Sequence, residues 1–213
     1  MATIPKRSKQ ATEVRQAGLI EAALQLAAQR SPAEITTGDL ARAVGITQGA
    51  VFRHFASKEA IWLAVLDWAT DTLMARLQAA ATNPANAAAG AASPLAALQA
   101  VFIAHVDFVI AHPGVPRVIF QELQHAQDTA LKAAVRRLMQ RYRTLLMGLL
   151  QRAQKQNLLA PGTDLPSATV LFMGSVQGLV MQSLMSGQVQ AMAAQAPGVF
   201  SIYLRGLTLK EAP

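Results

Sequence analysis

The stretch that decides the fold is residues 36–59, TTGDLARAVGITQGAVFRHFASKE. Leu40 and Val44 recur at helical spacing, and Gly45 then interrupts the pattern before a second short helix that begins at Ile46. Two short helices joined by a glycine turn are typical of a helix-turn-helix, whose second helix leaves one face free. Since the major groove of B-DNA admits one α-helix, the stretch predicts a DNA-reading element.

The second short helix carries side chains suited to a groove. Thr47 and Gln48 offer a hydroxyl and an amide for phosphate and base contacts, while Gly49 and Ala50 are small enough for close approach to the DNA. The residues predicted to contact DNA are Thr36, Thr37, Thr47, Gln48, Gly49, Ala50, Phe52, Arg53, His54 and Lys58.

The helix that follows is expected to begin at Ser57, whose hydroxyl can cap it. Free backbone amides at its start, with Lys58 beside them, make an anion site suited to a phosphate. Thr36 or Thr37 is expected to cap the first helix of the pair, with Asp39 favourably placed in its first turn.

Over roughly residues 14 to 66 the sequence resembles the TetR family of bacterial transcriptional regulators. The resemblance is carried by Gly45, Thr47-Gln48-Gly49, Phe52-Arg53-His54-Phe55 and Ser57-Lys58-Glu59. The family commonly has tyrosine where this chain has Phe52, so a hydroxyl often used on a phosphate is absent here.

The composition favours helices throughout. Hydrophobic residues make up 52% of the 213 residues and aromatic residues only 5%, because the apolar fraction consists largely of Ala and Leu, which are strong helix formers. We therefore expect an all-α fold. The formal net charge of +7 favours a polyanionic partner such as nucleic acid, and the absence of cysteine excludes disulfides and thiolate metal sites.

Helical periodicity, with proline and glycine as stops, predicts the further elements. The predicted helices cover residues 12–29, 58–80, 95–112, 115–127, 129–157, 165–186 and 197–209, and residues 81–94 are predicted to be a mobile loop. The core of the first three helices is predicted to contain Leu24, Ile35, Leu40, Val44, Ile46, Val51 and Phe55. We expect a DNA-binding domain with a basic arm over residues 1–56 and an effector-binding and dimerisation domain over residues 57–213, joined by the long helix 58–80.

Two basic stretches leave alternatives open. Residues 1–11 hold Lys6, Arg7 and Lys9 without an acid, which fits a solvated tail or an arm that follows the DNA backbone or minor groove. Between residues 132 and 155 there are seven basic residues and no acid. A solvated helix face explains them, as does attraction to DNA or to an anionic effector.

Residues for catalysis or metal binding do not form a recognisable pattern. The histidines are His54, His105, His112 and His125, and none has a partner at metal-site spacing. We expect no enzymatic activity, cofactor or metal. No apolar run of about twenty residues and no signal peptide is apparent, so we expect a cytoplasmic protein that does not use a membrane.

The C-terminal helices are expected to hold a small, apolar effector, because they supply flexible Met and Phe side chains that can line a cavity or form ordinary core. The predicted effector residues are Phe102, Asp107, Phe120, Gln121, Glu122, Tyr142, Met173 and Gln177. The family resemblance implies dimerisation through the last two helices, and the residues predicted for that contact are Leu171, Gly174, Ser175, Gly178, Met181, Phe200, Tyr203, Leu204 and Leu207.

Three functional hypotheses follow. The first is a homodimeric repressor that an effector releases from a palindromic double-stranded operator, with its two recognition helices about 34–36 Å apart. The second is a DNA-bound structural or partner-recruiting protein without an effector. The third is a helical protein attracted to acidic membrane surfaces.

Overall fold

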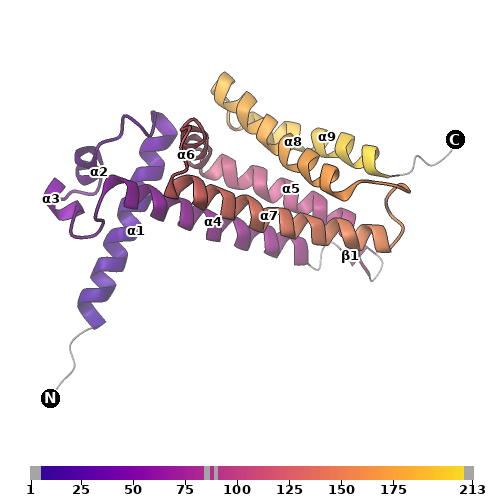
Figure 1. Cartoon of the computed structure of the whole chain (residues 1–213), viewed down its shortest axis with the longest axis horizontal. Coiled ribbons are helices and arrows are strands. Elements are labelled where there is room, and N and C mark those ends of the chain that lie inside the picture. The colour runs from indigo at the N-terminus through magenta and orange to yellow at the C-terminus, as the bar shows by residue number, and fades with distance from the viewer. Residues whose placement is uncertain (1–5, 84–86, 89–90, 209–213) are drawn as a thin grey trace, which may run out of the picture. The chain divides into compact units, whose positions relative to one another are not determined.

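The described part of the structure is helical almost throughout. This computed structural model describes residues 6–83, 87–88 and 91–208. Its elements in chain order are α1 (Lys6–Gln29), α2 (Thr37–Ala43), α3 (Gln48–Val51), α4 (Lys58–Thr82), β1 (Ala87–Ala88), β2 (Ala91–Ala92), α5 (Pro94–Ala111), α6 (Gly114–Leu123), α7 (Ala130–Lys155), α8 (Leu165–Ser186) and α9 (Ala191–Leu207) (Figure 1). The predicted all-α class is confirmed.

The connection between α4 and α5 contains the two short strands, which pair antiparallel as Ala87 with Ala92 and Ala88 with Ala91. The sequence predicted a mobile loop here. Part of that prediction falls on residues 84–86 and 89–90, which lie outside the described residues.

Two helices begin earlier than predicted. Helix α1 starts at Lys6, six residues before the predicted start, because the polar residues after Pro5 are good helix formers even though they lack apolar periodicity. The predicted tail covered residues 1–11; residues 6–11 belong to α1, and residues 1–5 lie outside the described residues. Helix α9 starts at Ala191 and contains Pro197, and the complete burial of Met192 shows the packing that favours this additional turn.

The chain packs as two compact units that are not consecutive segments. The first consists of the described part of Met1–Thr70 together with His112–Arg136, and the second of Asp71–Ala111 together with the described residues from Arg137 onward. Helices α4 and α7 contribute residues to both. The predicted division at residue 56 placed α6 in the C-terminal domain, whereas α6 packs on α1 in the first unit.

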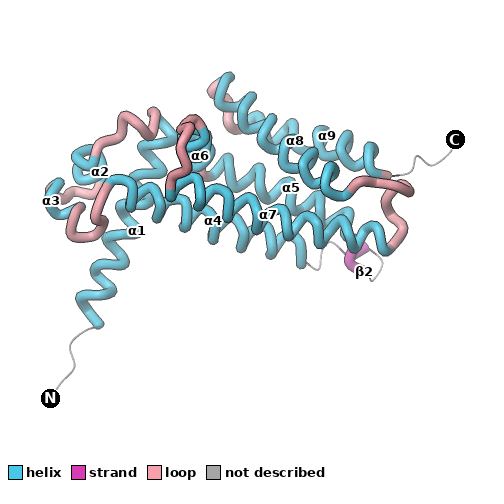
Figure 2. The backbone as a smooth tube through the Cα atoms, viewed as in Figure 1, coloured by secondary structure: helices cyan, strands magenta, loops and turns pink. Residues whose placement is uncertain are grey.

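The first unit buries the apolar faces of α1, α2, α3 and α6, and Figure 2 shows the short loops that connect α1, α2 and α3. Its buried side chains include Leu19, Leu24, Ile35, Leu40, Val51, Phe55 and Ile61. Of the seven predicted core residues, Val44 and Ile46 are only half-buried because they flank the turn between α2 and α3.

The second unit is centred on aromatic side chains from α5, α8 and α9, which lie side by side (Figure 1). The ring of Phe102 lies 5.2 Å from that of Phe172 in an edge-to-face arrangement and 5.4 Å from that of Phe200. Tyr203 packs on Phe172 and donates a hydrogen bond to the carbonyl of Ala168 at 3.1 Å. These geometries are those that aromatic rings prefer, so the cluster fixes how the three helices pack.

Two helices of the second unit are more apolar than we expected from the sequence. By length and composition alone, α5 and α8 could each cross a membrane, which corrects the expectation that no such segment is present. In each, 44% of the apolar window is buried inside the protein. Core helices of globular proteins have the same character, so length and composition are weak support for a membrane role.

Candidate nucleic-acid interface

The start of α2 is fixed by a reciprocal pair of hydrogen bonds. The hydroxyl oxygen of Thr36 accepts from the backbone N–H of Asp39 at 3.1 Å, and the Asp39 carboxylate accepts from the backbone N–H of Thr36 at 2.9 Å. The backbone N–H and the hydroxyl of Thr36, which both donate to this carboxylate, together with the guanidinium of Arg30 at 3.0 Å, hold the pKa of the Asp39 carboxyl well below its usual range. The predicted cap is confirmed at Thr36.

The turn between α2 and α3 depends on glycine. Gly45 has a φ of 68°, a left-handed conformation that side chains with a Cβ rarely adopt. The backbone N–H of Ile46 then bonds back to the carbonyl of Ala41 at 2.9 Å, which ends α2. The predicted glycine turn is confirmed.

Helix α3 is shorter than predicted and does not begin at Ile46. It runs from Gln48 to Val51, and its N-cap is Thr47, whose hydroxyl oxygen accepts from the backbone N–H of Ala50 at 3.3 Å. A hydrogen-bonded turn follows, in which the N–H of Arg53 bonds to the carbonyl of Ala50 at 3.2 Å. Arg53 therefore extends from a turn.

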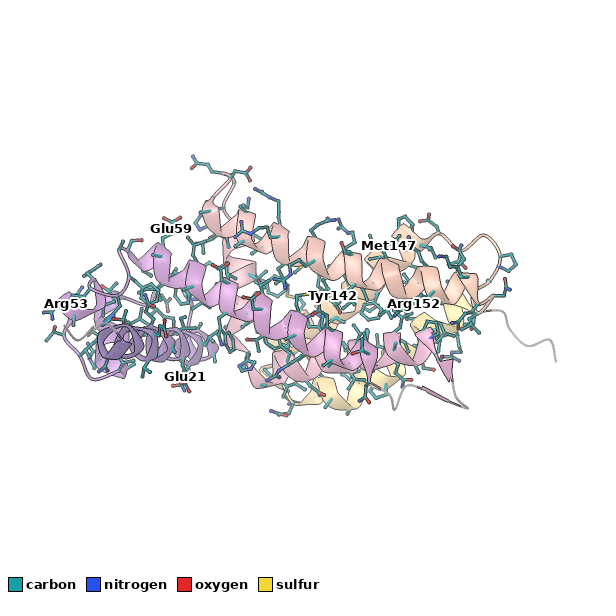
Figure 3. The ribbon with its side chains drawn as sticks, turned by 90° about the horizontal axis from the view of Figure 1, so that it is seen from below. Glu21, Arg53, Glu59, Tyr142, Met147 and Arg152 are labelled. Carbon is teal, nitrogen blue, oxygen red and sulfur yellow. The ribbon has the colours of Figure 1, made fainter. Side chains whose placement is uncertain are left out.

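One face of this segment is open to solvent. Val51 is completely buried, whereas Gln48, Gly49, Phe52 and Arg53 are exposed. Phe52 is 49% exposed, which is unusual for a large apolar side chain. Figure 3 shows Arg53 at the surface of its unit.

Several predicted contact residues already have partners within the protein. The Thr36 hydroxyl both accepts from the Asp39 N–H and donates to its carboxylate, so it has no donor left for a phosphate. Thr37 accepts from the side-chain amide of Gln48 at 2.8 Å but keeps its own hydroxyl proton. The Thr47 hydroxyl likewise accepts and can still donate.

The predicted anion site at the start of α4 is also partly used internally. The Ser57 hydroxyl accepts from the backbone N–H of Ala60 at 3.1 Å, which confirms Ser57 as a cap. The ammonium group of Lys58 donates to the carbonyl of Ala33 at 3.1 Å, and this lysine is half-buried within the first unit. His54 and Ala50, the remaining predicted contacts, are also half-buried.

The positive charge of the chain is shared between the two units. Within residues 6–70 and 112–136, eleven Lys or Arg face eight Asp or Glu, and the described second unit has seven against three. On α7, Arg136 pairs with Asp128 and Arg141 pairs with Asp71. Arg136 also lowers the pKa of the Asp128 carboxyl. The attraction of the first unit to DNA therefore depends on where its basic side chains lie, and not on its net charge alone.

The eight predicted effector residues do not come together in one unit. Phe120, Gln121 and Glu122 belong to the first unit, and the other five belong to the second. Gln121 accepts from the backbone N–H of Ala33, and Glu122 accepts from the hydroxyl of Thr129. Of the five in the second unit, Phe102, Tyr142 and Met173 are buried, and Asp107 and Gln177 are exposed.

The sequence did not indicate a polar pair in the second unit, formed by the half-buried His105 and the buried Tyr142. The ring nitrogen Nδ1 of His105 is hydrogen-bonded to the Tyr142 hydroxyl at 3.1 Å, and Figure 3 shows Tyr142 among the helices. Burial lowers the pKa of His105 to about 4, so the ring is neutral at pH 7, and burial raises the pKa of Tyr142. The feature of the sequence that could have indicated this pair is a histidine within the apolar run of α5.

A groove of about 320 Å³ lies on the second unit between α4 and α7. Its lining consists of Met74, Gln78, Gln140, Arg141, Thr144 and Leu145. None of them is among the predicted effector residues.

The surface of α8 and α9 differs from the predicted dimer contact. Phe200, Tyr203 and Leu207 are at most 6% exposed and form core, which corrects their assignment to an outer surface. Leu171, Met181, Gly174 and Gly178 are exposed as predicted, whereas Ser175 and Leu204 are half-buried. Three exposed apolar residues were missed: Val170 at 63%, Met185 at 74% and Ile202 at 65%. Val170 lies four residues before Gly174 and Met185 seven residues after Gly178, so helical spacing from the glycines indicated these two in the sequence.

Metal ligands do not gather in the described part of the chain: no three His, Cys, Asp or Glu side chains there are placed to hold one ion. The histidine beside an acid, His125, lies 3.8 Å from the buried carboxylate of Glu122.

Comparison with known proteins connects these features to a family. The family model described as "Bacterial regulatory proteins, tetR family" matches residues 19–65, and the one described as "Tetracyclin repressor-like, C-terminal domain" matches residues 119–197. The first match contains α2, the Gly45 turn and α3.

Related sequences and structures agree on the fold. The chain is 26% identical over 147 residues to the nucleoid occlusion factor SlmA of Glaesserella parasuis, covering 68% of this chain and 69% of that protein. The regulator FadR from Bacillus subtilis, solved with stearoyl-CoA, superposes with a TM-score of 0.76 at 18% identity, covering 89% of this chain and 98% of FadR. NalD of Pseudomonas aeruginosa, the secondary repressor of the MexAB-OprM multidrug efflux pump, superposes with a TM-score of 0.67 at 21% identity, covering 95% and 100%.

The fold, the exposed recognition segment and the two family matches confirm the resemblance read from residues 36–59. The chain belongs to the TetR family and is a DNA-binding regulator, not an enzyme.

Proposed function

We propose that this protein is a homodimeric repressor that binds a palindromic operator in the bacterial cytoplasm and is released by a small effector. The observation that carries the proposal is the exposed face of Gln48, Gly49, Phe52 and Arg53, opposite the buried side chain of Val51. An open face on a short helix whose other face is core is what groove insertion requires.

Each exposed side chain suits a different DNA contact. Arg53 can pair with a phosphate or bidentately with a guanine edge, and the amide of Gln48 can read an adenine. Phe52 lacks a hydroxyl for a phosphate, so its exposed ring suits apolar contact with a thymine methyl group. Gly49 allows the backbone to approach closely.

A two-fold dimer is supported by the outer surface of α8 and α9. Large apolar side chains are exposed on α8, at Val170, Leu171, Met181 and Met185, and on α9, at Ile202, and a partner surface would remove them from water. Gly174 and Gly178 lie among them on α8, where a small residue lets a second helix approach. Two recognition helices related by a two-fold axis would read the two halves of a palindrome.

Effector binding is supported by the interior of the second unit. Phe102, Tyr142 and Met173 are buried there, and the pair formed by His105 and Tyr142 supplies hydrogen-bonding groups within an apolar surrounding. An apolar interior with one polar pair matches the chemistry of a largely apolar effector with one polar group. An effector that favours one conformation would shift the population away from the DNA-binding one. The stearoyl-CoA complex of FadR and the efflux role in NalD's name make a long-chain acyl thioester and apolar drugs the first probes.

A second candidate function is a DNA-bound protein that recruits a partner instead of responding to an effector. It is favoured by the sequence relatives named nucleoid occlusion factor SlmA, one of which, from Marinobacter nauticus, is 23% identical over 81% of this chain and 85% of its own. Operator binding that no small molecule changes would favour this candidate.

The proposal is tested by selecting bound sequences from random duplex DNA with the purified protein at a stated salt concentration, since phosphate contacts make affinity salt-dependent. We expect an enriched palindrome, and effector candidates are then titrated into the operator complex. Binding without an enriched sequence would contradict the proposal.

The exposed Arg53 provides the matching test at residue level. We expect Arg53→Ala to weaken operator binding by about 1–3 kcal/mol through the loss of one base or phosphate contact, measured by fluorescence anisotropy. Arg76→Ala, at an exposed arginine on α4, serves as the control and should leave affinity unchanged. Equal affinities of the two variants would exclude a DNA contact by Arg53.

A further inference from the structure

In the connection between α1 and α2, the backbone of Ala33 is hydrogen-bonded to side chains from two other helices. The backbone N–H of Ala33 donates to the side-chain oxygen Oε1 of Gln121 on α6 at 2.8 Å, and the carbonyl of Ala33 accepts from the ammonium group of Lys58 on α4 at 3.1 Å. The Ser31 hydroxyl donates to the same oxygen of Gln121 at 3.3 Å and also accepts a longer, second hydrogen bond from the Ala33 N–H at 3.3 Å. Both backbone groups of Ala33 are thus tied to helices distant in sequence.

Gln121 can act as an anchor because α6 is itself firmly seated within the first unit. Gly114, at its start, packs so closely on α1 that an added Cβ would lie 2.3 Å from the carbonyl oxygen of Leu24 and 3.1 Å from the backbone nitrogen of Ala28. Val115 and Val118 are buried on the same helix. Figure 1 shows α6 beside α1.

The anchored residue is close to the elements that face DNA. Ile35, two residues after Ala33, is completely buried, and Thr36 is the cap of α2. Thr37, the first residue of α2, accepts the hydrogen bond from the Gln48 amide that links α2 to α3. A shift of the backbone at Ala33 would therefore be passed to α2 and, through Gln48, to the exposed recognition face.

We propose that Gln121 is a positioning residue for DNA recognition, which sets the placement of α2 and α3 by holding the backbone N–H of Ala33. The inference rests on the proposed operator binding and gives Gln121 a role other than the effector contact that the sequence suggested. Its oxygen already accepts two hydrogen bonds from the connection, so its first role lies within the DNA-binding unit.

Two substitutions in the full-length protein separate the hydrogen bond from the side-chain volume. Gln121→Met keeps the length of the side chain but has no strong acceptor, whereas Gln121→Glu keeps an acceptor for both donors. Gln124→Met, at the exposed end of α6, is the control. For each variant, amide exchange of Ala33 by NMR reports the contact, and anisotropy with the selected operator at two salt concentrations reports its consequence.

We expect Gln121→Met to speed exchange at Ala33 and to weaken operator binding by about three- to tenfold, the value of one ordinary hydrogen bond, with an unchanged salt slope because no phosphate contact is lost. Gln121→Glu should preserve slow exchange and, at the higher salt concentration, bind within about twofold of the wild type, because salt screens the added charge.

The outcomes distinguish this inference from the proposed function. A wild-type protein that enriches no operator defeats the proposed function, while slow exchange at Ala33 would still show the contact. A wild-type protein that binds its operator, with Gln121→Met binding equally well, overturns the positioning role. Failure of Gln121→Glu to restore both exchange and affinity overturns it as well.

Discussion

At the scale of single residues, Thr36 shows how one hydroxyl stabilises the start of the helix-turn-helix. It accepts from the N–H of Asp39 and donates to the Asp39 carboxylate. We expect Thr36→Ala to lower the free energy of unfolding by about 1 kcal/mol, the usual cost of removing an N-cap, measured by urea denaturation. Thr144→Ala, an exposed threonine whose hydroxyl bonds only to the Gln140 carbonyl of its own helix, should change it by less than about 0.5 kcal/mol. Similar losses in the two variants would show that the cap contributes nothing.

His105 gives the stability a predictable dependence on pH. Its pKa is about 4 in the folded protein against 6.5 ordinarily, because burial disfavours the charged ring. Between these values the unfolded chain binds a proton that the folded chain does not. The stabilisation is therefore complete above pH 6.5 and is lost as the pH falls toward 4, by a total of about 3 kcal/mol.

The test of this pH dependence is the slope of unfolding free energy between pH 6.5 and 5, above the range where carboxylates such as that of Asp39 titrate. We expect His105→Phe to have a shallower slope than the wild type, although its absolute stability should fall because the Tyr142 hydroxyl loses its partner. Equal slopes would show that His105 is not the titrating group.

At the scale of elements, the packing of α6 on α1 depends on the absence of a side chain at Gly114. A Cβ there would meet the Leu24 carbonyl oxygen at 2.3 Å, so Gly114→Ala must move one helix from the other. We expect a loss of roughly 1–3 kcal/mol in the free energy of unfolding, measured by urea denaturation.

Gly148 on α7 provides the matched control, since a Cβ there would meet nothing within 4 Å. Gly148→Ala should raise stability by roughly 0.5–1 kcal/mol, because alanine is the better helix former. If Gly114→Ala were also stabilising, the close seating of α6, and with it the anchor for Gln121, would be refuted.

At the scale of the whole molecule, the exposed apolar surface of α8 and α9 predicts assembly. Ile202 is 65% exposed on α9, and burying it in a dimer would be favourable, whereas burying an unpaired carboxylate there would be costly. We expect Ile202→Asp to shift the protein from dimer to monomer in sedimentation velocity and to weaken operator binding with it. Leu123→Asp, at a residue 50% exposed in the first unit, should leave the dimer intact.

Gly178→Leu tests the same surface without a charge. A Cβ at Gly178 meets nothing within 4 Å, so the folded monomer should tolerate the larger side chain while a second helix could no longer approach. A dimer of unchanged strength in both Ile202→Asp and Gly178→Leu would place the interface elsewhere.

Much of the helix-turn-helix could be predicted from the sequence because its structure depends on interactions between residues close together in the chain. The cap at Thr36, the turn at Gly45 and the cap at Ser57 depend on residues within five positions of each other, so residue types alone determined them. The all-α class follows for the same reason, since helix formation is governed by neighbouring residues. The family resemblance rests on this same local stretch.

Tertiary structure decided what depends on distant neighbours. Helix α8 is apolar on more than one face, so its periodicity could not show that Phe172 is core while Val170 faces outward. Likewise, Phe200 and Tyr203 were assigned to the surface because the sequence does not show that Phe102 of α5 packs on Phe200 and Phe172 of α8 on Tyr203. The position of α6 in the first unit depends on contacts between residues far apart in the sequence. The hydrogen bond from Ala33 to Gln121, for example, joins residues 88 positions apart. Such contacts are set by the packing of whole helices, which no local pattern encodes.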